Sequence, residues 1–208
     1  MIKALHHPFF YPFFRVYTRW KIRRCFSGVF IDGHYSENNL PVLMIVNHFS
    51  WWDGFWAEYL NLKLFRRKYH FMMLEKELRS NMFLNKTGGY SINRGSRSVI
   101  ESLDYTASLL SDSGNIVLMF PQGKFESMHL RDFRFEKGVE YVLKKVKTPV
   151  QIIFVVNLIE YYSNQKPLLT IHFREYNDPD RSSEALEREF NRFYSAAVGK
   201  NIASAPSS

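Results

Sequence analysis

Cysteine is almost absent from this sequence, which contains 208 residues and Cys25 as its one cysteine. A single cysteine excludes an internal disulfide and indicates a reducing compartment or the cytoplasmic face of a membrane. Long apolar runs are absent too: no stretch of about 18 uninterrupted apolar residues occurs, so we expect no transmembrane helix. Arginines interrupt the apolar residues near the start and no small-residue cleavage site follows, which excludes a typical secretory signal peptide.

Acidic residues are missing from residues 1–31, where basic residues are frequent. The net charge of the chain is +8, so part of this excess is concentrated at the N-terminus. A basic surface attracts nucleic acid, anionic lipid headgroups or anionic substrates. No recognisable nucleic-acid-binding module occurs, and the basic residues alternate with bulky apolar ones. We therefore expect membrane lipids, and no nucleic acid, as partners.

The composition is typical of one folded domain with a substantial core. Hydrophobic residues make up 46% of the chain, charged residues 23% and aromatic residues 17%. The aromatic share is high, which fits either contact with lipid or a core rich in rings.

Residues 9–26 show the periodicity of an amphipathic helix. One predicted face, at the spacing i, i+3, i+4 and i+7, holds Phe13, Val16, Tyr17 and Trp20. Another face holds Arg15, Arg19 and Arg23. Rings that enter the acyl boundary and arginines that meet lipid phosphate are typical of an interfacial helix. A helix packed on its own domain is the alternative. We predict a membrane-associating segment at 1–28, a domain at 29–202 and a flexible tail at 203–208.

Predicted strands and helices alternate beyond this segment. Strands are expected at 29–35, 42–47, 70–74, 90–93, 116–120, 150–156 and 168–173. Helices are expected at 53–64, 75–84, 96–111, 135–147 and 183–198. Short apolar strands without strict alternation indicate a sheet covered on both faces. We predict an α/β fold with a mixed, partly parallel central sheet flanked by helices.

The sharpest chemical feature is the pair His48 and Asp53, directly after the predicted strand 42–47. Open α/β sheets place their sites at the carboxyl ends of strands. His48 can act as a base near neutral pH, and a nearby carboxylate can fix the tautomer of its ring. No G-x-S-x-G elbow occurs, so we expect the base to activate a substrate hydroxyl, with Ser50 as the internal alternative. A structural or solvated histidine is the other interpretation.

Two further clusters, at 88–97 and 120–124, also lie beside predicted strands. In the first, Arg94 and Arg97 can clamp a phosphate, and Ser96 fits the N-cap of the following helix. In the second, a Pro-x-Gly turn exposes main-chain N–H groups at the edge of the sheet. Taken alone, the first cluster could equally be a surface turn, and the second would be interpreted as a plain turn.

Together and in this order, the clusters resemble motifs of the glycerolipid acyltransferase family, whose best known members are the 1-acyl-glycerol-3-phosphate acyltransferases. The motif N-H-x-S-x-x-D is matched by Asn47, His48, Ser50 and Asp53. The motif G-x-x-F-I-x-R is matched from Gly88 to Arg94, with Ser91 in place of Phe. The motif F-P-E-G-x-x-S is similar to residues 120–126, with Gln122 in place of Glu and without the distal Ser. The resemblance spans residues 29 to 160 and includes an f-K-x-G-like segment at 135–138 and Pro149.

The resemblance implies transfer of a fatty acyl group from acyl-CoA or acyl carrier protein to a hydroxyl of a lysophospholipid or related lipid. It implies His48 as general base, Asp53 as its partner and Arg94 as the ligand of an acceptor phosphate. The other expected substrate contacts are Asn47, Ser50, Gly89, Arg97, Pro121, Gln122, Gly123 and Lys124. We expect no metal and no cofactor besides the acyl donor, and a peripheral location on the cytoplasmic face of the cell membrane. Because Gln122 lacks a carboxylate charge, a lipid-binding protein on the same fold is the alternative.

Overall fold

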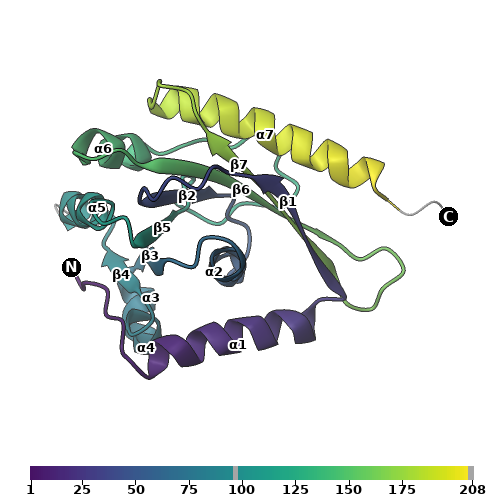
Figure 1. Cartoon of the computed structure of the whole chain (residues 1–208), viewed down its shortest axis with the longest axis horizontal. Helices are drawn as coiled ribbons and strands as arrows, with labels where there is room; N and C mark the ends of the chain where they lie inside the picture. The colour runs from purple at the N-terminus through teal and green to yellow at the C-terminus, as the bar shows by residue number, and fades with distance from the viewer. Residues whose placement is uncertain (96–97, 206–208) are drawn as a thin grey trace.

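The computed structural model describes residues 1–95 and 98–205 (Figure 1). The described residues form a seven-stranded sheet in the order β1-β7-β6-β2-β5-β3-β4. The strands are β1 Gly28–His34, β2 Val42–Val46, β3 Lys68–Leu74, β4 Gly89–Ile92, β5 Asn115–Met119, β6 Gln151–Glu160 and β7 Leu168–Tyr176. Strands β6, β2, β5, β3 and β4 run parallel, whereas β7 is antiparallel to β6 and pairs in parallel with β1. The predicted mixed, partly parallel α/β sheet is confirmed.

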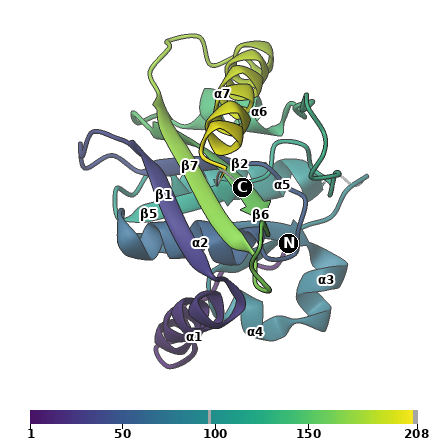
Figure 2. The same cartoon turned by 90° about the vertical axis from the view of Figure 1, so that its right-hand side faces the viewer.

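Helices cover both faces of this sheet. They are α1 Phe10–Cys25, α2 Asp53–Lys63, α3 Glu75–Ser80, α4 Met82–Asn85, α5 Ser98–Leu109, α6 Gly138–Lys145 and α7 Ser183–Ala203. Helices α5, α6 and α7 pack on one face, and α1 and α2 pack on the other. Figures 1 and 2 show α1 and α7 on opposite sides of the sheet. In Figure 2, α3 and α4 lie beside α1 at the same end of the molecule.

Strand β2 shows why the apolar strands do not alternate with polar residues. Leu43 and Ile45 point into the core under α5, α6 and α7. Val42, Met44 and Val46 point into the core shared with α1 and α2. All five side chains are buried, and full burial of each large aliphatic group contributes roughly 1.5–3 kcal/mol to stability. A central strand therefore has to be apolar on both faces.

Several predicted boundaries differ from the structure. The single helix predicted at 75–84 is broken at Asn81, whose φ of −133° and ψ of 53° separate α3 from α4. The helix predicted at 135–147 begins only at Gly138, because the main chain of residue 136 bonds to Pro121 instead. Helix α7 continues to Ala203, past its predicted end, and begins with a Ser182 side-chain cap on the N–H of Ala185. The predicted helix start at residues 96–97 and the tail at 206–208 lie outside the described residues.

Helix α1 packs through a different face from the one that carries its rings. Its buried residues are Phe14, Thr18 and Ile22. The predicted aromatic face remains exposed: 60% of Phe13 and 52% of Trp20 are accessible to solvent. Within residues 1–95 and 98–205, no helix has the length and apolar character needed to span a membrane.

Candidate active site

Three loops meet at one edge of the sheet. Asn47 and His48 follow β2, Arg94 follows β4, and residues 120–124 follow β5. Since these strands run parallel, their carboxyl ends lie on the same edge. The fold therefore gathers clusters that are far apart in the sequence at the usual site of an open α/β sheet.

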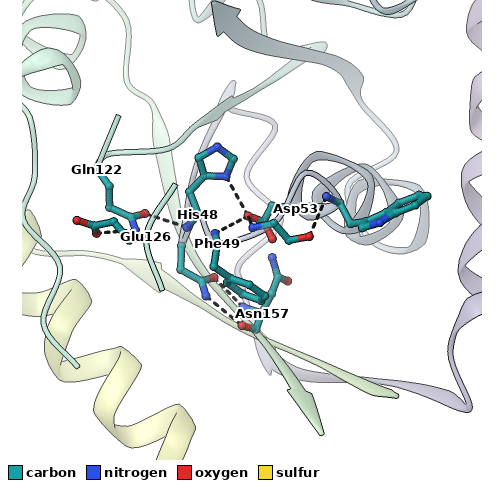
Figure 3. A network of polar contacts seen from close by, with 9 residues as sticks. His48, Phe49, Asp53, Gln122, Glu126 and Asn157 are labelled. Carbon is teal, nitrogen blue, oxygen red and sulfur yellow. Dashed lines mark hydrogen bonds and ion pairs between the residues drawn. The ribbon is translucent and has the colours of Figure 1, made fainter. Parts of the chain in front are cut away.

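The carboxylate of Asp53 holds the ring of His48 in place (Figure 3). Its Oδ2 atom lies 2.9 Å from Nδ1 of His48. The same oxygen accepts the main-chain N–H groups of Phe49 at 2.8 Å and Ser50 at 2.9 Å. Asp53 is the first residue of α2, where the helix dipole favours a negative charge. With Nδ1–H donating to Asp53, Nε2 on the far side of the ring is the nitrogen that can accept a proton.

Asp53 is fully buried, and this environment sets its electrostatics. Burial raises the pKa of Asp53, while the hydrogen bonds from His48, Ser50 and Phe49 act in the opposite direction. Its second oxygen, Oδ1, is buried and accepts no hydrogen bond from the residues that the structure describes. In such a weakly screened site, a positive charge on the imidazole would attract the carboxylate more strongly than in water.

The loop after β5 fixes the main chain and the ring of His48. The N–H of His48 donates to Oε1 of Gln122 at 2.9 Å, and its carbonyl accepts the N–H of Glu126 at 3.0 Å. The ring of Phe120 stacks on the imidazole with centroids 3.7 Å apart and planes 11° apart. The ring of Phe125 covers the imidazole too, at 4.0 Å and 32°. The imidazole is thus restricted to one orientation.

The side chain of Asn47 hydrogen-bonds the end of β2 to the main chain of β6. Its Nδ2 donates to the carbonyl of Asn157 at 3.0 Å, and its Oδ1 accepts the N–H of Asn157 at 2.8 Å (Figure 3). Asn47 is buried, with 2% of its surface exposed. We therefore propose that it positions the following His48, while its predicted contact with substrate has no support from this geometry.

A cavity of about 730 Å³ opens beside His48. This volume lies within the range of roughly 300–1,000 Å³ that is typical of ligand sites. Its walls are mostly apolar and include Phe55, Phe71, Met73, Leu103, Leu118 and Val139. Of the predicted site residues, those that border it are His48, Arg94, Pro121, Gly123 and Lys124. The imidazole therefore lies where an apolar cavity and cationic residues come together.

Other predicted contacts lie away from this cavity. Gln122 is buried behind His48, and Gly89 is buried within β4. Ser50 uses its Oγ to accept the N–H of Trp52 at 3.1 Å, so it stabilises the turn that leads into α2. Arg97 lies outside the described residues. The contacts of Gln122, Gly89 and Ser50 are with the protein itself.

Arg94 lies directly against Gly123. A Cβ atom added to Gly123 would be 2.5 Å from Nη2 of Arg94 and 3.3 Å from Cγ of Glu136. Gly123 also has a φ of +67°, which favours glycine. The second and third clusters are therefore in contact, and the absence of a side chain at 123 makes room for the guanidinium.

Across the part of the chain that the structure describes, no group of three or more His, Cys, Asp or Glu side chains could hold a metal ion. Among the described residues, the titratable ones that border the cavity are His48, Arg94, Lys124, Lys137, Glu77, Glu136, Tyr69 and Tyr141. A ligand with a hydroxyl and an anionic headgroup fits this set.

The sequence interpretation missed Phe125, Glu126 and Asn157. Phe125 and Glu126 directly follow the third cluster, so their place in the chain was the available signal. Glu126 stands where the motif F-P-E-G-x-x-S has its distal Ser. Asn157 had no sequence signal, because its main chain alone contacts Asn47.

Comparison with known proteins finds a family model whose match includes all three clusters. Residues 28–156 match the protein-family model described as Acyltransferase. The match covers more than half of the chain and includes every predicted site residue. No curated protein matches the sequence.

Proposed function

The chain belongs to the acyltransferase family, and from this premise we propose that it moves a fatty acyl group from acyl-CoA or acyl carrier protein to a hydroxyl of a lysophospholipid or related lipid. The observation that carries this proposal is the His48–Asp53 pair at the border of a large apolar cavity. The cavity suits a fatty acyl chain, and the imidazole suits proton abstraction from an alcohol. Neither feature alone would indicate acyl transfer.

In the proposed reaction, Nε2 of His48 takes the proton of the acceptor hydroxyl. The oxygen then attacks the thioester carbonyl, and the carbon–sulfur bond breaks as the tetrahedral intermediate collapses. The imidazolium returns its proton to the leaving thiolate. Asp53 holds Nδ1–H throughout and stabilises the positive ring, which it can do from 2.9 Å. The enzyme needs no nucleophile of its own, which fits the turn-stabilising role of Ser50.

We propose that Arg94 binds the phosphate of the acceptor. Its guanidinium borders the cavity beside Gly123 and can offer two parallel N–H donors to phosphate oxygens. Lys124 and Lys137 border the same cavity and add positive charge. Arg94→Ala should weaken binding of phosphate-bearing acceptors more than of neutral ones. Equal activity of wild type and variant on every phosphate-bearing acceptor would refute this role.

We further propose that α1 attaches the protein peripherally to the cytoplasmic face of the cell membrane. Its exposed aromatic face is unusual for a helix that already packs through Phe14 and Ile22. From this face, Tyr17 contacts Phe55 with ring centroids 6.4 Å apart, and Phe55 contacts Trp51 at 5.1 Å. Phe55 and Trp51 border the cavity. A lipid could therefore pass from the membrane surface to the site along a continuous apolar path.

The central experiment measures transfer of a labelled acyl group by the purified protein in lipid vesicles. Acyl-CoA and acyl carrier protein are compared as donors, with a panel of lysolipids as acceptors. His48→Ala should lose roughly 10²–10⁴-fold in turnover, the usual contribution of a general base. His34→Ala, an exposed histidine on β1, is the matched control. Binding of lipid without turnover by the wild type would favour the lipid-binding alternative.

A further inference from the structure

The carboxylate that the third motif lacks at residue 122 reappears four residues later, at Glu126. Gln122 donates from Nε2 to Oε2 of Glu126 at 3.0 Å. The two positions at which this sequence departs from F-P-E-G-x-x-S are thus in direct contact. A glutamate at 122 would bring two carboxylates together, so the two departures depend on each other.

Three hydrogen bonds close a ring through His48, Gln122 and Glu126, and Figure 3 shows the side chain of Gln122 between the other two residues. The N–H of His48 donates to Gln122, the amide of Gln122 donates to Glu126, and the N–H of Glu126 donates back to the carbonyl of His48. Each polar group of the His48 main chain therefore depends on this ring. Glutamine suits the middle position because its amide accepts from one neighbour and donates to the other.

This hydrogen-bonded ring also determines where the side chain of Phe125 lies. Phe125 immediately precedes Glu126, and its ring covers the imidazole although half of it is exposed to solvent. A ring so exposed gains little from burial and needs the main chain to hold it in place. The bond from the N–H of Glu126 to His48 provides that restraint.

We propose that Glu126 is a positioning residue for the base: through Gln122 and its own N–H it fixes the His48 main chain and places Phe125 over the imidazole. This inference rests on the proposed role of His48. Lys124 is the charged residue that faces the Glu126 carboxylate, with Nζ 3.5 Å from Oε1. The side chain of Glu126 is 17% exposed, so its charge is partly screened.

Exchange of the two residues gives the sharpest test. Gln122→Glu alone places two carboxylates about a hydrogen bond apart, and one of them has to bind a proton for the ring to close. We expect its turnover to fall at least tenfold at pH 8 and clearly less at pH 6. The double variant Gln122→Glu/Glu126→Gln restores one acceptor and one donor, with the roles exchanged. Its turnover should return to within about threefold of wild type, without the added pH dependence.

Folding and positioning are separated by further measurements. Thermal unfolding of each variant reports the fold, and Glu184→Gln on the exposed surface of α7 is the matched control. Glu126→Ala should lower kcat more than it changes KM. It should also move the NMR chemical shift of the His48 imidazole toward that of a histidine that no aromatic ring covers. A double variant no more active than Gln122→Glu alone would overturn the proposal. So would a folded Gln122→Glu with wild-type turnover at pH 8. Absence of acyl transfer by the wild-type protein would instead count against the proposed function.

Discussion

The guanidinium of Arg15 on α1 lies 3.8 Å from Oε1 of Glu58 on α2, and the side chain of Glu58 is completely buried. Burial raises the pKa of Glu58 to about 8, although a hydrogen bond from Asn61 and the charges of Arg15 and Arg19 oppose the shift. Helix α2 also carries Asp53 at its start. A titratable contact to a buried carboxyl group is therefore among those that join the proposed membrane helix to the helix of the proposed catalytic pair.

Replacement of Glu58 should change how stability depends on pH. Above its ordinary pKa of 4.5, an unfolded chain releases the proton, whereas the folded protein keeps it up to about pH 8. The folded state then binds more protons than the unfolded state, so this group lowers the free energy of unfolding as pH rises between these values. Glu58→Gln should remove that decline. The free energy of unfolding of the variant minus that of wild type should therefore be about 1 kcal/mol or more higher at pH 8 than at pH 4.

Urea unfolding of wild type and Glu58→Gln at pH 4, 6 and 8 measures this effect. Glu37→Gln, at an exposed loop position, is the control. A difference between Glu58→Gln and wild type that stays constant across the three pH values would show that folding does not shift the pKa of Glu58.

Asp53→Asn should separate catalysis from folding. The asparagine can keep an acceptor where Oδ2 receives its three bonds, but it carries no charge to stabilise an imidazolium. We expect kcat to fall by roughly 10²–10⁴-fold with little change in KM. Burial raises the pKa of the Asp53 carboxyl group, so its negative charge is costly in the folded protein. The substitution removes this charge, and the variant should therefore remain folded at neutral pH.

Steady-state kinetics and thermal unfolding are measured together on this variant, with the exposed Asp132→Asn as control. Turnover of Asp53→Asn within threefold of wild type would mean that the carboxylate has no part in stabilising the charged ring.

The strand order along the chain and the pairing of His48 with Asp53 could be predicted because both depend on neighbouring residues. An apolar run followed by a polar turn identifies the end of a buried strand, and a spacing of five lets the carboxylate reach back to the ring. Contacts between loops could not be predicted in this way. The bonds between Asn47 and Asn157, 110 residues apart, depend on which strands become neighbours. Sequence periodicity does not predict the order in which the strands lie side by side in the sheet.

Helix α1 shows the same limit for a single element. Its sequence contains an aromatic stripe and a second, less obvious stripe at Phe14, Thr18 and Ile22. The second is the one that packs on the domain. Periodicity established that the helix is amphipathic but could not say which stripe meets the protein, because a stripe of large rings is typical of a core and of a membrane surface alike.

Gly123→Ala should disturb the predicted phosphate site through a direct clash. The added Cβ would lie 2.5 Å from Nη2 of Arg94, and the φ of +67° is unfavourable for alanine. Gly95→Ala is the matched control, because its φ of +76° imposes a similar backbone strain while its Cβ would meet none of the described residues within 4 Å. Each variant should lose about 1 kcal/mol of stability.

Acceptor kinetics distinguish the clash from the strain. Gly123→Ala alone should raise KM for a phosphate-bearing acceptor several-fold, because the guanidinium has to move. Similar KM values for the two alanine variants would indicate that Arg94 relocates without cost or does not hold the acceptor.

The exposed rings of α1 provide the last prediction, on membrane binding. Phe13→Ala/Trp20→Ala removes two rings that are at least half exposed, so the fold should tolerate the change while binding to vesicles weakens. We expect at least a tenfold lower partition into vesicles that contain anionic phospholipid, measured by sedimentation. Ile202→Ala is the matched control, because Ile202 is 70% exposed on α7, on the opposite side of the sheet.

Charge contributes separately from the rings. Arg19, Arg23 and Arg24 are exposed on α1, and attraction between such groups and lipid phosphate is screened by salt over a Debye length of about 8 Å at physiological ionic strength. Their replacement by glutamine should weaken binding at low salt and leave it almost unchanged at high salt, whereas loss of the rings should weaken binding at both. If the double ring variant sediments like wild type at every salt concentration, α1 is not the attachment element, and the apolar path past Phe55 and Trp51 has to start from another surface.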